Sequence, residues 1–223
     1  MTTSRRSSSS RGRTYGGESP EVRARRRYQA FLQAGYELFG TVGYRNTTMR
    51  KLCKSAGLTD RYFYAAFHSM EDLLVAVYEK QVAEIQQHIL TAVLAVQPKG
   101  DTEALIHAGL DAFFSAVEDA RTARIVWQEV MGVSARVDEV YHQTVQNFAN
   151  LLRSLMQGVY PEWLATRDAD LVHGVALGLV GSISQVTLDW LLSDYQAPRE
   201  KVVATIATIL RGLMLVAESE SAD

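Results

Sequence analysis

Apolar side chains recur along most of the chain at intervals of three and four residues, which is the spacing of one face of an α-helix. We expect helices over about 22–40, 48–55, 60–66, 69–96, 102–119, 121–131, 134–158, 168–193 and 199–217. Alternating apolar and polar runs between turns, the pattern of half-buried strands, do not occur. The sequence therefore predicts an all-α fold.

Glycine and threonine mark the boundaries of the first helices. Gly40 and Gly43 end the first helix, and Gly57 lies in a tight turn between two short ones. Thr47 and Thr48 are the N-cap candidates of the first short helix, and Thr59 can cap the second. The helix that begins after Ser69 should be about 42 Å long, enough to join a small N-terminal domain to a separate body.

Positive charge is concentrated at the N-terminal end. Residues 1–61 hold thirteen Arg and Lys against four acidic residues, a net charge of +9. The whole chain has a net charge of −2, so the remainder has −11. A basic end on an acidic body indicates that only this end meets a polyanion such as nucleic acid.

The two short helices and the longer one before them fit a three-helix DNA-binding unit. The major groove accepts one α-helix, and a second helix packed across it fixes its angle. Helical spacing turns one set of residues inward: Met49, Leu52, Cys53, Leu58, Phe63 and Phe67. It leaves a polar set facing outward: Arg50, Lys51, Lys54, Asp60, Arg61, Tyr62 and His68.

Many residues of this region stand at fixed offsets from one another. They are Ala34, Leu38-Phe39, Gly43-Tyr44, Thr47-Thr48, Ala56-Gly57-Leu58-Thr59, Tyr64, Phe67 and Ser69-Met70-Glu71-Asp72-Leu73-Leu74. In these positions the chain resembles the TetR family of bacterial transcriptional regulators. The resemblance implies a helix-turn-helix domain followed by a helical ligand-binding and dimerisation domain.

The recognition helix departs from the family pattern. Arg61 and Tyr62 stand where the family often has glycine and a small residue, and Met70 stands where lysine is usual. Arg61 can read guanine or hold phosphate, and Tyr62 can contact a thymine methyl or the backbone. We expect DNA contacts from Thr47, Thr48, Arg50, Lys51, Thr59, Asp60, Arg61, Tyr62, Tyr64 and His68.

The chain thus divides into four expected parts: a disordered basic tail (1–20), a helix-turn-helix domain (21–68), a helical ligand-binding and dimerisation domain (69–218) and a short tail (219–223). The first tail has almost nothing to bury. It is either a solvated leader or an arm that touches DNA phosphates or the minor groove.

Large, adaptable apolar side chains are spread over the C-terminal body. Core packing is the simpler explanation for any one of them, but the family resemblance implies a cavity between helices, and such side chains are typical of pocket walls. Little formal charge lies near the helix centres, so we expect an apolar or amphipathic effector. Its expected contacts are Phe114, Trp127, Met131, Tyr141, Phe148 and Trp190.

Small residues on helix 168–193 indicate close helix packing. With the last helix they would form a four-helix interface across a two-fold axis. The expected interface residues are Gly174, Gly178, Gly181, Ser182, Ile206, Leu210 and Leu213.

Other classes of protein find little support. We see no glycine-rich phosphate loop after a strand, no nucleophile elbow and no zinc-protease motif, so we expect no enzyme, cofactor or metal site. Cys53 is the one cysteine, which excludes an intramolecular disulfide. Residues 171–188 lack formal charge, but Asp170 and Asp189 flank them, which favours a buried helix over a membrane span.

Together these features predict a cytoplasmic, homodimeric repressor that binds a palindromic operator and is released by a small ligand. The alternative is an effector-independent architectural DNA-binding protein, whose body would be packed solid. A third reading, an enzyme with an appended DNA-binding domain, would need convergent polar groups in the body.

Overall fold

The computed structural model describes residues 19–96, 101–159 and 161–221, and every regular element within them is a helix. The predicted all-α fold is confirmed. The elements are α1 (Pro20–Thr41), α2 (Met49–Ala56), α3 (Asp60–Tyr64), α4 (Met70–Val96), α5 (Thr102–Val117), α6 (Ala120–Arg124), a π-helical turn η1 (Ile125–Glu129), α7 (Ala135–Val159), α8 (Pro161–Ala165), α9 (Ala169–Leu192) and α10 (Arg199–Ser221).

Most helices begin and end within two residues of their predicted positions. The helix expected over 121–131 is instead α6 followed by the π-helical turn, and the short α8 begins at Pro161, where only a break was expected. Ser19 caps α1 by accepting a hydrogen bond from the Val22 amide at 3.2 Å. The proposed DNA-contacting arm falls almost wholly on residues 1–18, which lie outside the described residues.

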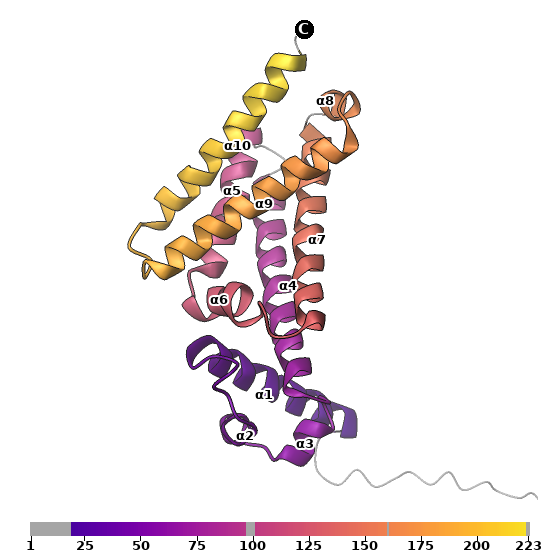
Figure 1. Cartoon of the computed structure of the whole chain (residues 1–223), viewed down its shortest axis with the longest axis vertical. Coiled ribbons are helices and arrows are strands. Elements are labelled where there is room, and N and C mark those ends of the chain that lie inside the picture. The colour runs from indigo at the N-terminus through magenta and orange to yellow at the C-terminus, as the bar shows by residue number, and fades with distance from the viewer. Residues whose placement is uncertain (1–18, 97–100, 160, 222–223) are drawn as a thin grey trace, which may run out of the picture.

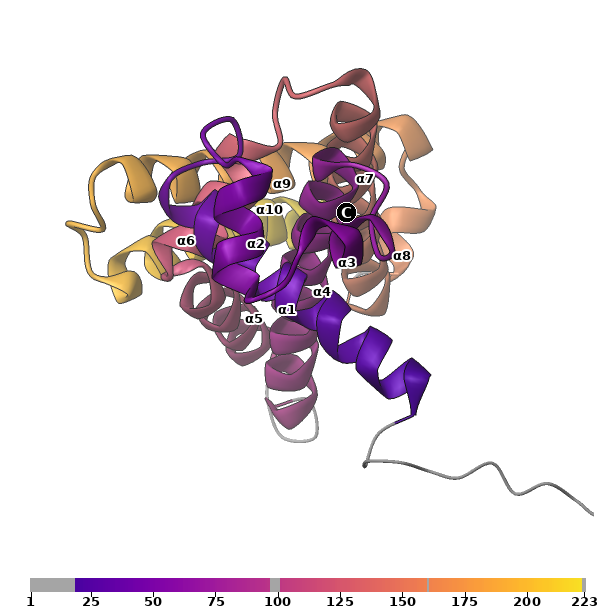
Figure 2. The same ribbon diagram turned by 90° about the horizontal axis from the view of Figure 1, so that it is seen from below.

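The helices α1, α2 and α3 form one end of the molecule, which we call the head, and α4 rises from it into the body (Figure 1). In the body, α4 packs along α5, α7 packs against α9, and α10 packs against α5 and α9. Seen from below, α2 and α3 lie nearest the viewer, away from the body (Figure 2). This end of the molecule is therefore open to a partner.

Aromatic side chains hold the head together. Phe31 of α1 and Phe63 of α3 are fully buried and meet edge to face with ring centroids 5.4 Å apart. Tyr28 stacks on Phe67 at 4.8 Å, and Leu52 brings α2 into the same core. Because truncating a buried Phe costs about 3–5 kcal/mol, these contacts fix the angle of α3 relative to α1.

A single turn joins α9 to α10 beside the end of α5. Asp194 and Tyr195, between α9 and α10, have φ of 51° and 55°. Tyr195 donates from its hydroxyl to the Val117 carbonyl at 3.0 Å, and the Trp190 indole donates to the Ala197 carbonyl at 2.8 Å. Because these bonds are satisfied within the body, the turn tolerates its left-handed backbone.

The end of α1 lies directly against α6. A methyl group on Gly40 would lie 2.8 Å from the Arg121 Cα, closer than carbon atoms approach in proteins. Only glycine lets the two backbones come this near. The head is therefore seated on the body through α1 as well as through the continuous chain into α4.

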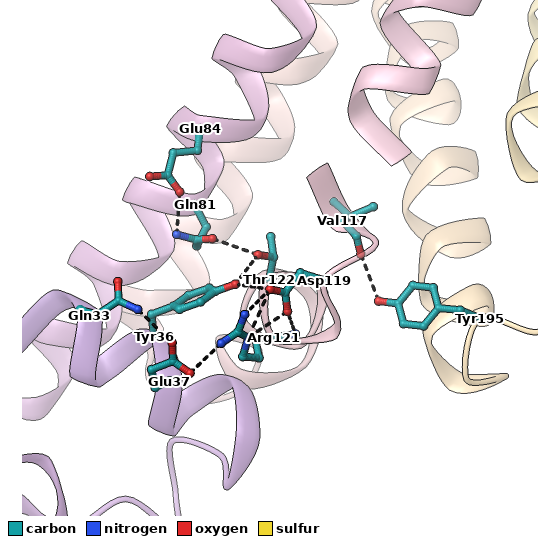
Figure 3. A network of polar contacts seen from close by, with 10 residues as sticks. All are labelled: Gln33, Tyr36, Glu37, Gln81, Glu84, Val117, Asp119, Arg121, Thr122 and Tyr195. Atoms are coloured by element: carbon teal, nitrogen blue, oxygen red, sulfur yellow. Dashed lines mark hydrogen bonds and ion pairs between the residues drawn. The ribbon is translucent and has the colours of Figure 1, made fainter. Parts of the chain in front are cut away.

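Polar side chains surround this contact (Figure 3). Arg121 donates to Glu37 of α1 at 2.7 Å and to Asp119 at 2.6 Å. The Tyr36 hydroxyl donates to Asp119 at 3.0 Å and lies 3.0 Å from the Thr122 hydroxyl, which donates in turn to Gln81 of α4. One network thus joins α1, α4 and α6.

The network shifts the ionisation of its members. The hydrogen bond from Arg121 lowers the pKa of the Asp119 carboxyl, and the bond to Asp119 raises the pKa of the Arg121 guanidinium. Burial raises the pKa of the Tyr36 hydroxyl. At neutral pH Asp119 is therefore ionised and Tyr36 is neutral, which suits the observed donor and acceptor roles.

The pKa of Asp119 predicts how stability depends on pH. Since this pKa lies below its ordinary value of 3.8, the ionised carboxylate stabilises the fold above that pH, and the stabilisation is lost as the pH falls through the folded-state pKa. Asp119→Asn should lower the free energy of unfolding at neutral pH by up to about 1 kcal/mol, because water screens the half-exposed ion pair. Denaturant unfolding should show this difference shrinking below about pH 4. A difference that stays constant into acid would contradict the assignment.

Candidate DNA-binding surface and ligand cavity

The turn between α2 and α3 is built by three local features. The Thr48 side chain caps α2 by accepting a hydrogen bond from the Lys51 amide at 3.3 Å. Gly57 ends α2 with φ of 64°, a left-handed conformation that glycine adopts without strain. The Leu58 amide then donates to the Cys53 carbonyl at 3.0 Å, which turns the chain into α3.

The paired threonines have different roles. Thr48 is exposed, whereas Thr47 is buried and donates from its hydroxyl to the Gly43 carbonyl at 2.8 Å. Thr59 precedes α3 without a side-chain cap, and Asp60 accepts from the Arg61 amide at 2.8 Å instead. Of the expected DNA contacts, Thr47 is thus the one that lies inside the fold.

The other expected DNA contacts are all exposed and lie on α2, on α3 or within a few residues of them. Exposed residues there are Thr48, Arg50, Lys51, Thr59, Asp60, Arg61, Tyr62, Tyr64 and His68. Tyr62 and Tyr64 expose 40% and 60% of their surface, which is unusual for aromatic side chains with a core beside them. Lys51 donates to the Asn46 carbonyl at 3.1 Å and so stays near the start of α2.

An arginine from another helix orients the exposed Tyr62. The Arg27 guanidinium of α1 lies over the Tyr62 ring, 4.6 Å from its centroid. Such a cation–π contact contributes about 0.5–1 kcal/mol at an exposed site. Sequence reasoning missed this pair, since the two residues are far apart in the chain and Arg27 reads only as one member of a basic run.

Cys53 is half-buried on the inner side of α2 and packs against the head core. Burial raises the pKa of its thiol, so it is protonated at neutral pH. These features agree with the small apolar residue that was expected there.

The π-helical turn η1 contacts the head with its last residue. The Glu129 carboxylate accepts a hydrogen bond from the Tyr44 amide at 2.7 Å, just after α1. A side chain on Gly43, whose φ is 88°, would crowd this carboxylate.

Arginine side chains add further contacts between head and body. Arg124 donates to the Thr41 carbonyl at 2.9 Å, and Arg45 donates to the Gly132 carbonyl at 3.0 Å. Salt bridges from Arg136 of α7 to Asp72 and Glu71 add a second connection at the start of α4.

The body contains a cavity of about 490 Å³ between α4, α5, η1, α7, α9 and α10. Its walls are mainly aliphatic and aromatic. At the end near the head, Phe113, Val126 and Trp127 are buried. At the other end, Leu151, Leu155 and Gly158 of α7 are exposed. The cavity is thus closed toward the head and open toward the far end of the body.

Three of the six expected ligand contacts line this cavity: Trp127, Tyr141 and Phe148. Phe114 and Trp190 pack against each other in the body core with ring centroids 5.9 Å apart. Met131 is exposed beside the junction of head and body, where it lines a separate polar hollow. The spacing of apolar residues along a helix shows which side chains face inward, but it does not show whether they line a cavity or pack in the core.

Small residues form an exposed stripe along α9. Gly174, Gly178 and Gly181 face open space, with Leu171 and Leu192 exposed near the ends of the same helix. Ser182 donates to the Gly178 carbonyl at 2.8 Å. By length and composition, α9 is the one helix among the described residues that qualifies as a membrane span.

The expected interface residues of α10 turn toward the protomer. Ile206 is 1% exposed and belongs to the body core, while Leu210 and Leu213 are half-buried and line the cavity. The outward side chains of α10 include Ile209 and Leu215, which are 42% and 65% exposed. The exposed surface of α10 is therefore not the face that Ile206, Leu210 and Leu213 form.

Comparison with known proteins finds a family match for the N-terminal part of the chain. A model described as bacterial regulatory proteins, tetR family, matches residues 31–77, which span the helix-turn-helix region and the start of α4. The fatty acid metabolism regulator protein of Bacillus subtilis (strain 168) is 19% identical over 176 residues, 76% of this chain and 86% of that protein.

Solved structures share the fold over most of their length. The fatty acid degradation regulator FadR from Bacillus halodurans superposes with a TM-score of 0.70 at 17% identity, over 87% of this chain and 96% of that chain. FadR from Bacillus subtilis in complex with stearoyl-CoA gives 0.65 at 17% identity, over 82% and 97%. Residues 31–77 thus match the helix-turn-helix region of the tetR family of bacterial regulatory proteins, and the chain as a whole shares the all-helical fold of these solved regulators.

Proposed function

We propose that the chain is a cytoplasmic, homodimeric repressor that leaves its operator when a long-chain acyl ligand fills the cavity. One observation carries the proposal: Val126 and Trp127 line the cavity, and Glu129, in the same turn, holds the Tyr44 amide of the head. A ligand against this turn acts on both sides of the junction at once.

The ligand class follows from the cavity wall and from the relatives. A volume of about 490 Å³ lies within the range of small-molecule sites. The wall is apolar, as an acyl chain requires. The curated regulator from Bacillus subtilis is named for fatty acid metabolism and the similar structure from Bacillus halodurans for fatty acid degradation, and the FadR structure from Bacillus subtilis holds stearoyl-CoA.

The π-helical form of η1 supports its role as the moving part. Such turns carry one extra residue per turn and are often found at functional sites. A ligand that favours a different position of Trp127 would shift Glu129, and with it the loop after α1. It can do so only through different affinities for the two arrangements of the head.

The rival reading, an architectural DNA-binding protein without an effector, needs a solid body. The cavity between α4, α5 and α7 argues against a solid body.

For DNA contact we propose Arg61 as the base-reading residue, with Tyr62 held by Arg27 beside it. Thr48, Arg50, Lys51, Thr59, Asp60, Tyr64 and His68 supply the surrounding contacts, and Thr47 supports the loop from inside.

Release of DNA by ligand tests the proposed function directly. Stearoyl-CoA should weaken binding of the full chain to an operator selected from randomised DNA by at least about fivefold, the low end of ordinary allosteric coupling. Fluorescence anisotropy of labelled operator gives the measurement, with coenzyme A alone as the control. Ligand binding should be measured directly, so that the protein is known to be saturated. DNA affinity that stays unchanged under saturation would contradict release of the repressor by ligand.

Base readout separates two positive side chains of the head. Arg61→Ala should relax the preference at one base pair of each half-site, because a bidentate arginine–guanine contact contributes about 1–3 kcal/mol of discrimination. Lys51→Ala should weaken binding to all sequences about equally, since phosphate contacts position the protein without specifying sequence. Selection from randomised DNA distinguishes these outcomes. If Arg61→Ala selects the same motif as the unmodified chain, base readout lies elsewhere.

The exposed stripe on α9 predicts how the dimer forms. We propose that Gly174, Gly178, Gly181 and Ser182 face the same stripe of a second copy. Gly178→Leu should yield monomers with weak operator binding, whereas Gly178→Ala should remain dimeric because it keeps the face small. Sedimentation velocity reads the difference. A full-strength dimer of the leucine variant would place the interface on another surface.

A further inference from the structure

The closed end of the cavity holds a polar group with no partner. Tyr78 of α4 lines this end and is 1% exposed. Its hydroxyl makes no hydrogen bond of ordinary geometry among the described residues, although the Thr144 hydroxyl lies close enough to lower the pKa of Tyr78 in part. A buried hydroxyl without a hydrogen bond is destabilising, so its presence against an apolar wall calls for an explanation.

Other polar atoms gather at the same place. Tyr141 and Thr144 of α7 line the cavity beside Tyr78, and Tyr141 is half-buried. Thr144 donates its own hydroxyl hydrogen to the Val140 carbonyl at 3.0 Å. The closed end therefore combines a phenol with neighbouring hydroxyls, whereas the walls toward the mouth are mainly aliphatic.

Formal charge is absent from this site. None of the described residues that line the cavity is Asp, Glu, Lys, Arg or His. Burial raises the pKa of Tyr78 to about 12, so its hydroxyl is a neutral donor at physiological pH. An ionised carboxylate here would lie in an apolar site without a counter-charge, which is unfavourable. A neutral oxygen is the group that this end can accept.

We infer that the cavity is built for a lipid chain that carries a neutral oxygen at its far end, an ω-hydroxyacyl or ω-oxoacyl chain, with Tyr78 donating a hydrogen bond to that oxygen. The inference rests on the proposed function, since it takes the acyl chain to lie in this cavity. Along α7, the distance from Tyr141 to Leu155 is about 21 Å, which suits a long extended chain. The charged head group then stays at the exposed mouth, near Leu151 and Leu155, where water solvates it.

Two ligands of equal chain length test the inference. By isothermal titration calorimetry the full chain should bind ω-hydroxypalmitoyl-CoA about fivefold to tenfold more tightly than palmitoyl-CoA, the usual net effect of one added buried hydrogen bond. Tyr78→Phe should bind the two ligands with equal affinity. Tyr195→Phe is the matched control, because it removes the same atom outside the cavity and should keep the preference.

Thermal unfolding of the unliganded proteins gives a second readout. Tyr78→Phe should raise the melting temperature by about 2–4 °C, because it removes an unsatisfied hydroxyl. Tyr195→Phe should lower the melting temperature, because its hydroxyl bonds the Val117 carbonyl. A lower melting temperature for Tyr78→Phe would mean that its hydroxyl is satisfied, and would overturn the inference.

The binding outcomes distinguish the inference about the far oxygen from the proposed acyl ligand. Equal affinity of the unmodified chain for both ligands would overturn the inference about the far oxygen and leave the acyl-regulator function standing. A preference that persists in Tyr78→Phe would overturn the role of Tyr78. If neither ligand binds, both the inference and the proposed acyl ligand are overturned.

Discussion

The rest of the structure depends on the packing of α1, and of the residues just after it, against α6 and η1; we call this contact the seat. Gly40 brings α1 within contact distance of Arg121, and Glu129 holds the Tyr44 amide that follows the helix. Because α1 also supplies Phe31 to the head core, the position of α3 is tied to this seat through packed side chains. A shift of the seat therefore reorients the recognition helix as part of one rigid unit.

The cavity in the body borders the same seat, because η1 forms part of its wall. Val126 and Trp127 form part of its closed end, only two or three residues before Glu129. The network of Tyr36, Asp119 and Arg121 stabilises the head in the observed arrangement, and its partly exposed ion pairs contribute modestly. Modest contacts suit a switch, because a ligand's differential affinity need only exceed a few kcal/mol to change the populations.

Local rules predicted the elements well and their contacts less well. Helical period, the capping residue Thr48 and the turn residue Gly57 predicted the helices of the head to within about two residues, because caps and turns depend on neighbours in the chain. Thr59, expected to cap α3, makes no side-chain cap. The π-helical turn, the Arg27–Tyr62 contact and the unpartnered Tyr78 hydroxyl depend on residues that only the fold brings together. For the same reason Ile206, apolar and correctly spaced, was assigned to the interface although it lies in the protomer core.

The central claim is that Glu129 transmits cavity occupancy to the head. The most direct test is the ratio of operator dissociation constants with and without saturating stearoyl-CoA, measured for the unmodified chain and for Glu129→Met. By linkage, the same ratio must appear in the ligand affinity of free and DNA-bound protein. We expect a ratio well above one for the unmodified chain and a ratio close to one for Glu129→Met. The Glu129→Met protein should still bind the operator alone and stearoyl-CoA alone. An unchanged ratio in a folded Glu129→Met protein would contradict it.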